Sequence, residues 1–62
     1  MGTEVEIDPL QQAYKEWLKM EIKKLKQYRR TFYKLWVNTG NELYKKQVNR
    51  IQAKIRELEA QL

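Results

Sequence analysis

A single break divides this chain into two long stretches in which apolar residues recur with helical spacing. The break is the tetrapeptide "NTGN", Asn38 to Asn41, in which Gly40 suits the left-handed residue that ends a helix. Neither stretch is interrupted by another glycine or by an internal proline. Because a short connection makes consecutive helices antiparallel neighbours, the sequence predicts an all-α fold, an antiparallel helical hairpin of two long helices.

The stretch after the break has the most regular pattern. Its apolar residues follow one another at steps of four, three, four, three and four: Tyr44, Val48, Ile51, Ile55, Leu58 and Leu62. This repeat is typical of the seam of a left-handed coiled coil or helical bundle. We expect a helix over about residues 41 to 62, begun by Thr39 and Glu42 as a capping box.

The stretch before the break has a looser pattern of threes and fours. Its members are Leu10, Tyr14, Leu18, Ile22, Leu25, Tyr28, Phe32 and Leu35. Asp8 and Pro9 suit the cap and the first position of a helix, so we expect one over about residues 9 to 38, followed by a turn at 38 to 41. Residues 1 to 7 show no helical period and are expected to form a flexible acidic tail. Residues 8 to 62 would form one helical-hairpin domain.

Folding one helix back on the other pairs residues whose numbers sum to about 80. The expected pairs are Leu35 with Tyr44, Phe32 with Val48, Tyr28 with Ile51, Leu25 with Ile55, Ile22 with Leu58, and Leu18 with Leu62. The first helix is longer by roughly two turns, and these carry Leu10, Tyr14 and Trp17. A chain of 62 residues buries a small core. We therefore expect a homodimer that forms a four-helix bundle, with a host protein that supplies the missing face as the alternative.

The charge is unevenly distributed. Thirteen basic residues against eight acidic ones give a net charge of +5, and no acid lies between Glu21 and Glu42. This excess favours an acidic protein or nucleic acid as partner. The candidate phosphate contacts are Lys23, Lys26, Arg29, Arg30, Lys34, Lys45 and Lys46. The alternative interpretation is that these residues form only the solvated outer face that every bundle helix needs.

Aromatic residues gather beside these cations at the turn end of the hairpin. Trp, Tyr and Arg are the residues that dominate protein interfaces, and they also stack on bases. The candidate interface with a partner or a second copy comprises Leu10, Tyr14, Trp17, Tyr33, Trp36 and Val37. Binding to a membrane surface is a weaker hypothesis, because the second helix already covers the apolar face of the first.

The sequence lacks the usual material of catalysis. It contains no cysteine, histidine or serine, which removes the commonest nucleophiles, bases and zinc ligands. No carboxylate pair in either helix has the spacing that would place both on one helical face. We expect no enzyme activity, no metal and no cofactor. We also expect no signal peptide and no membrane span, and hence a cytoplasmic protein.

Two functions fit these patterns. The first is a small non-catalytic interaction module, a self-associating basic helical hairpin that binds its own copy or a protein partner. The second is a small nucleic-acid-binding regulator of the phage or plasmid kind, which would use the basic face of the first helix.

Overall fold

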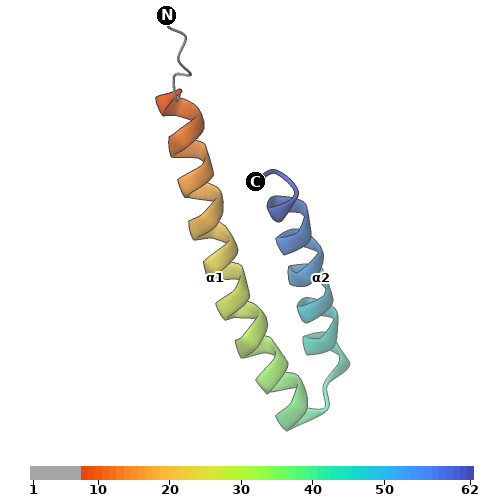
Figure 1. Cartoon of the computed structure of the whole chain (residues 1–62). Helices are drawn as coiled ribbons and strands as arrows, with labels where there is room; N and C mark the ends of the chain where they lie inside the picture. The colour runs from red at the N-terminus through yellow and green to blue at the C-terminus, as the bar shows by residue number, and fades with distance from the viewer. Residues whose placement is uncertain (1–7) are drawn as a thin grey trace, which may run out of the picture.

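A computed structural model describes residues 8 to 62, which form two α-helices packed against each other. Helix α1 spans Pro9–Thr39 and helix α2 spans Glu42–Glu59. Figure 1 shows the two helices running side by side from the turn. The start of α1 and the end of α2 therefore lie at the opposite end of the hairpin, which we call the open end. The predicted antiparallel hairpin is confirmed. The tail expected at residues 1 to 7 lies outside the described part of the chain.

The start of α1 is set by its first two residues. The Asp8 carboxylate accepts a hydrogen bond of 2.9 Å from the Leu10 amide, and Pro9 occupies the first turn, where a missing N–H costs nothing. At the other end, Gly40 has a φ of 69° and its N–H donates to the Trp36 carbonyl at 2.7 Å. Gly40 therefore ends α1 in the left-handed conformation that the sequence predicts.

The capping box expected from Thr39 and Glu42 is wrong. Thr39 is the last residue of α1, and its hydroxyl donates to the Leu35 carbonyl at 2.7 Å. Asn41 caps α2 instead, because its side-chain oxygen accepts from the Leu43 amide at 2.9 Å. The Thr39 hydroxyl also accepts from the Asn41 amide at 3.1 Å, so this side chain joins the two helix ends without starting the second helix.

The fully buried core is small. Leu18 and Ile22 of α1 meet Ile55 and Leu58 of α2, and Leu25 and Ile51 pack against this cluster while partly exposed. Toward the turn the seam continues with half-buried aromatic residues, where the rings of Phe32 and Tyr44 lie 6.1 Å apart. The core therefore occupies the middle and the open half of the hairpin.

The seam of α1 differs from the expected one at two positions: Arg29 takes the place of Tyr28, and Trp36 takes the place of Leu35, which is half-buried beside it. Tyr28, predicted to face Ile51, is 54% exposed, whereas Arg29 is half-buried and its guanidinium donates to the Gln52 side chain. The observed seam residues are Leu18, Ile22, Leu25, Arg29, Phe32 and Trp36, at steps of four, three, four, three and four. This spacing matches that of α2. As a result Arg29, a charged residue, lies in the seam at the turn where the apolar pattern predicted Tyr28.

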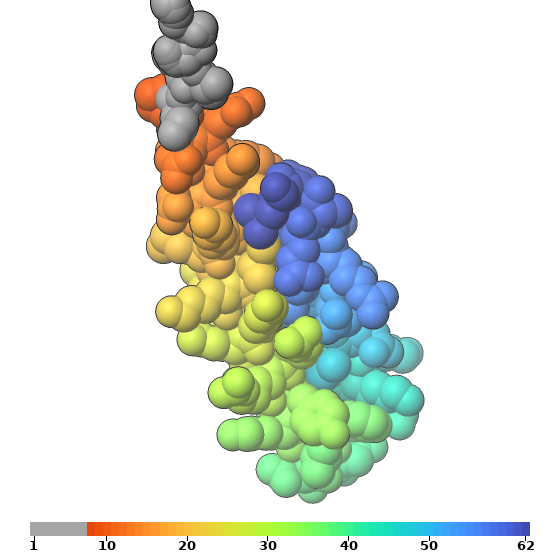
Figure 2. Space-filling view, viewed as in Figure 1, coloured from red at the N-terminus to blue at the C-terminus, as the bar shows by residue number. Residues whose placement is uncertain are grey.

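The open end also differs from the expectation. Helix α2 ends at Glu59 rather than near residue 62, and Leu62, predicted to face Leu18, is 52% exposed. Tyr14 of α1 donates a hydrogen bond to the Gln61 side chain just beyond α2. Figure 2 shows the first turns of α1 standing clear of the second helix.

Candidate interaction surfaces

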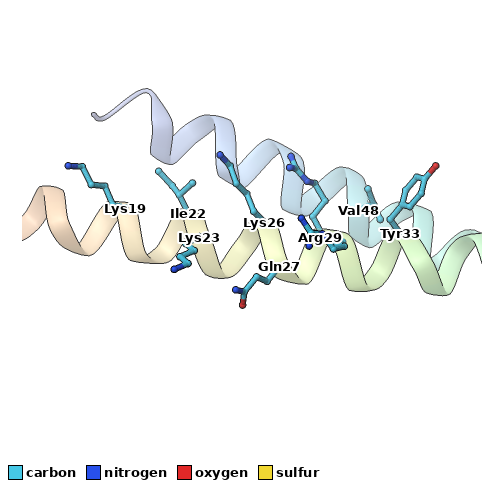
Figure 3. A pocket seen from close by; sticks show the side chains of 9 residues that line it. Lys19, Ile22, Lys23, Lys26, Gln27, Arg29, Tyr33 and Val48 are labelled. Carbon is cyan, nitrogen blue, oxygen red and sulfur yellow. The ribbon is translucent and has the colours of Figure 1, made fainter.

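One side of the hairpin carries a groove between the helices that is lined mainly by cations. We call it the basic groove; it encloses about 650 Å³ and is lined by Lys19, Ile22, Lys23, Lys26, Gln27, Arg29, Arg30, Tyr33 and Val48. Figure 3 shows Lys26 and Arg29 reaching toward α2, Lys19 extending toward the open end of the hairpin, and Lys23 and Gln27 pointing away from α2. Five of the nine lining residues are cations and none is an acid, so the lining of the groove is positively charged.

Contacts with α2 hold two of these cations in place. Arg29 is tied to Gln52, and Lys26 lies 3.5 Å from the Glu59 carboxylate, with both side chains of this ion pair about half exposed. An exposed ion pair of this kind adds little stability, so the lysine is available for another anion. Lys34, Lys45 and Lys46, also predicted as phosphate contacts, are exposed but do not line the groove.

The aromatic residues at the turn end contact each other. The Tyr33 and Trp36 rings meet edge to face with centroids 5.8 Å apart, and the Lys45 ammonium lies 5.4 Å from the centre of the Trp36 ring. Trp36 is half-buried, because it continues the seam, whereas Tyr33 is 52% exposed at the end of the basic groove. Of the three predicted interface residues here, Trp36 already has partners within the chain, and Val37 is exposed.

The other side of α1 carries a second surface, which we call the aromatic flank. It consists of Leu10, Trp17, Tyr28 and Leu35, whose spacings of seven, eleven and seven place them on one line along the helix. Tyr28 lies two residues from Lys26, which corresponds to opposite sides of an α-helix, so this line runs away from the basic groove. Leu10, Trp17 and Tyr28 are all exposed.

A shallow apolar trough lies beside this flank. It encloses about 470 Å³, and its lining residues are Leu25, Gln47, Arg50, Ile51, Ala53, Lys54 and Glu57. Leu25 and Ile51 are the two apolar residues of the core cluster that stay partly exposed. Leu43, which is 63% exposed, precedes Arg50 by seven residues and Lys54 by eleven, so it extends this apolar surface along α2.

Two lysines along the aromatic flank each pair with a glutamate of their own helix. Lys24 lies 3.3 Å from Glu21 on α1, and Lys54 lies 3.4 Å from Glu57 on α2. Each of these lysines has a carboxylate one helical turn away, so the flank presents both signs.

The structure separates the predicted interface residues into two groups. Tyr14 and Trp17 stack near the open end with ring centroids 5.8 Å apart, and Leu10 lies beyond them. The second group, Tyr33, Trp36 and Val37, lies near the turn. Tyr33 is about 28 Å from Tyr14 along the axis of α1. Sequence reasoning missed Tyr28 as a surface residue and Gln52 as the partner of Arg29. The strict four-three spacing of α2, imposed on α1, would have placed Tyr28 outside the seam, whereas Gln52 belongs to no such series and carries no signal in the sequence.

No helix within residues 8 to 62 is long and apolar enough to cross a membrane. No group of three or more acidic side chains gathers there in a way that would hold a metal ion. Every buried side-chain nitrogen or oxygen in the same range has a hydrogen-bond partner.

Comparisons of the chain with protein-family models, with curated proteins and with solved structures each found no match.

Proposed function

We propose that this chain is a non-catalytic interaction module that pairs with a second copy of itself through the aromatic flank. The observation that carries this proposal is the line of Leu10, Trp17 and Tyr28, all exposed, along one side of α1. Together with Tyr14 and Leu43, this side holds five of the nine large apolar residues that the described structure exposes. Exposed apolar surface concentrated on one side of a small domain marks an interaction site.

Symmetry favours the aromatic flank over the basic groove as the dimer contact. In a twofold dimer each surface meets a copy of itself, so the basic groove would bring its cations against the same cations of the partner. The aromatic flank would instead bring apolar residues together, with Glu21, Lys24, Lys54 and Glu57 offering opposite charges at its edge. The product would be a four-helix bundle whose two basic grooves stay outside.

The trough supplies a place for a ring of the second copy. Helices in bundles pack by inserting side chains of one helix between those of the next. Leu25 and Ile51 form an apolar floor within the trough, and Tyr28 lies one turn along α1 from Leu25. A symmetric contact in which each Tyr28 enters the other copy's trough would cover the two core residues that one hairpin leaves partly exposed.

Sedimentation equilibrium tests this proposal directly. The chain has a mass of 7.6 kDa, and we expect a species of about twice that mass at micromolar concentration. Trp17→Glu should give the single-chain mass, because a charge on the aromatic flank would be buried in the dimer. Val37→Glu, on the side of the groove, is the matched control and should keep the dimer. A folded wild-type chain that stays monomeric at about 100 µM, well above the Kd of a stable dimer, contradicts the proposal.

A further inference from the structure

We propose that the basic groove binds single-stranded nucleic acid, with its cations on the phosphates and the Tyr33 ring stacked on a base. This activity goes beyond self-association and uses the opposite side of α1. The groove is lined by Lys19, Lys23, Lys26, Arg29 and Arg30 with no acid among the lining residues. A row of cations with an exposed aromatic ring at its end is the combination that single-strand binding surfaces use.

The spacing of the cations suits a linear polyanion. Lys19, Lys26 and Arg30 are separated by seven and four residues, which places them along about 17 Å of α1. A single strand presents its phosphates as one flexible row that can follow such a line. The groove is therefore long enough for a strand of several nucleotides, within the range of about 4 to 16 that small single-strand sites cover.

The arginine at the floor of the groove is held in position. Arg29 is half-buried, and its hydrogen bond to Gln52 fixes the guanidinium against α2. Figure 3 shows it between Lys26 and Tyr33, with Val48 of α2 beside it. A guanidinium is planar and keeps further donors for phosphate oxygens while one is engaged, so Arg29 offers a preorganised contact.

Tyr33 decides between a nucleic acid strand and other anionic partners. Its ring is 52% exposed, and Trp36 supports it edge to face at 5.8 Å, which leaves ring surface for a base. A duplex keeps its base faces stacked inside and offers none to Tyr33. An acidic protein has no base to stack. An anionic membrane would need apolar surface beside the cations, and five of the nine large apolar residues exposed in the described structure lie on the other side of the hairpin.

The test measures the binding of a fluorescein-labelled single strand of about 12 nucleotides by fluorescence anisotropy as the salt concentration rises. Each phosphate contact with a single strand contributes about −0.7 to the slope of log K against log salt, so four contacts give a slope of about −3. The triple variant Lys19→Gln, Lys26→Gln and Arg30→Gln should reduce the slope by about 2 and weaken binding about 100-fold at 0.1 M salt.

A second triple variant removes the same charge at exposed positions that line neither the groove nor the trough: Lys34→Gln, Lys46→Gln and Arg56→Gln. It should bind within a few-fold of wild type. Circular dichroism and light scattering check that both triple variants keep the helicity and mass of wild type. Equal losses in the two would show that net charge, and not the groove, governs binding, and this result would overturn the proposal.

Tyr33→Ala tests the stacking step separately. Loss of one stacked base should weaken binding about 5-fold to 100-fold with the salt slope unchanged, because no charge is removed. Failure to bind the single strand at low salt, or binding that does not depend on salt, overturns the proposal. So does a duplex of the same length, or polyglutamate, that binds as tightly as the single strand.

Discussion

The basic groove and the aromatic flank lie on opposite sides of one two-helix seam, and they differ in how they can meet their partners. The groove is lined by five cations and no acid, with the exposed ring of Tyr33 at one end. The flank has apolar side chains with lysines and glutamates already paired beside them. A surface of one sign repels its own copy, while a balanced apolar surface tolerates it. We therefore propose self-association for the flank and an anionic partner for the groove.

Both surfaces depend on the same core, and removing it should have the largest effect. Ile55 is 1% exposed, and Ile55→Ala should lower the free energy of unfolding by about 2 to 5 kcal/mol. Urea unfolding followed by circular dichroism, at one fixed protein concentration, measures this change. Self-association and oligonucleotide binding should fall together.

Met20→Ala is the control for this experiment, because Met20 is 62% exposed and belongs to neither surface. It should change stability by less than about 0.5 kcal/mol. Retention of both binding activities by an unfolded Ile55→Ala chain would show that neither activity needs the hairpin.

Tyr28 and Tyr33 give the sharpest test of the comparison, because they are the same residue with 54% and 52% exposure on opposite sides of α1. A twofold dimer contains Tyr28 twice, so Tyr28→Ala should weaken dimerisation by about 2 kcal/mol at roughly 1 kcal/mol per copy, or about 30-fold in Kd. Sedimentation equilibrium measures the shift.

Tyr33→Ala should leave the dimer Kd within about 2-fold of wild type, since a surface substitution outside an interface changes binding little. Equal weakening of dimerisation by the two alanine variants would mean that the dimer contact is not confined to one side. Weakening by Tyr33→Ala alone would place it on the side of the groove.

Arg29 is a residue at which the seam predicted from the sequence differs from the seam in the structure. The ends of the helices followed from local chemistry at Asp8, Pro9 and Gly40, and the hairpin followed from the apolar spacing on either side of the break. The seam could not be read from apolarity alone, because Tyr28 is apolar enough to continue the pattern and Arg29 is charged. The regular four-three spacing of the partner helix takes Arg29 into the seam, where its aliphatic stem packs and its guanidinium finds Gln52.

The presence of Arg29 in the seam in place of Tyr28 also explains why the candidate surfaces were only partly predictable. The sequence predicts a basic face on the first helix, and four of its candidate phosphate contacts line the groove: Lys23, Lys26, Arg29 and Arg30. The groove itself needs Val48 and the adjacent surface of α2, which a one-helix pattern does not contain. Tyr28 was assigned to the core, so the aromatic flank lost its central residue.

Replacing the Arg29 and Gln52 pair tests whether the charge in the seam serves stability or binding. Exchange of a partly buried polar pair for apolar residues is often neutral or stabilising, so Arg29→Leu with Gln52→Leu should raise the free energy of unfolding by about 1 kcal/mol. The same variant should lose one phosphate contact, which reduces the salt slope by about 0.7. Urea unfolding and anisotropy measure the two changes.

Gln52→Leu alone is the control for the double variant, because it leaves the arginine charge in place. Its salt slope should stay at the wild-type value. A double variant that is less stable than wild type by more than about 1 kcal/mol would show that the pair supports the fold, contrary to the expected exchange.

The smallest expected effect is a gain in binding. Glu59 of α2 lies 3.5 Å from Lys26 of the groove, whereas the other groove lysine with a carboxylate partner, Lys19, pairs within α1 with Glu16 at 3.8 Å. Glu59→Gln should release Lys26 to a phosphate and strengthen oligonucleotide binding by up to about 5-fold at 0.1 M salt, with stability changed by less than about 0.5 kcal/mol because the pair is exposed. Glu57→Gln is its counterpart beside the aromatic flank, where the carboxylate lies 3.4 Å from Lys54. Both substitutions add one positive charge to the chain, so a gain seen only with Glu59→Gln locates the binding site in the groove, and equal gains would assign it to net charge.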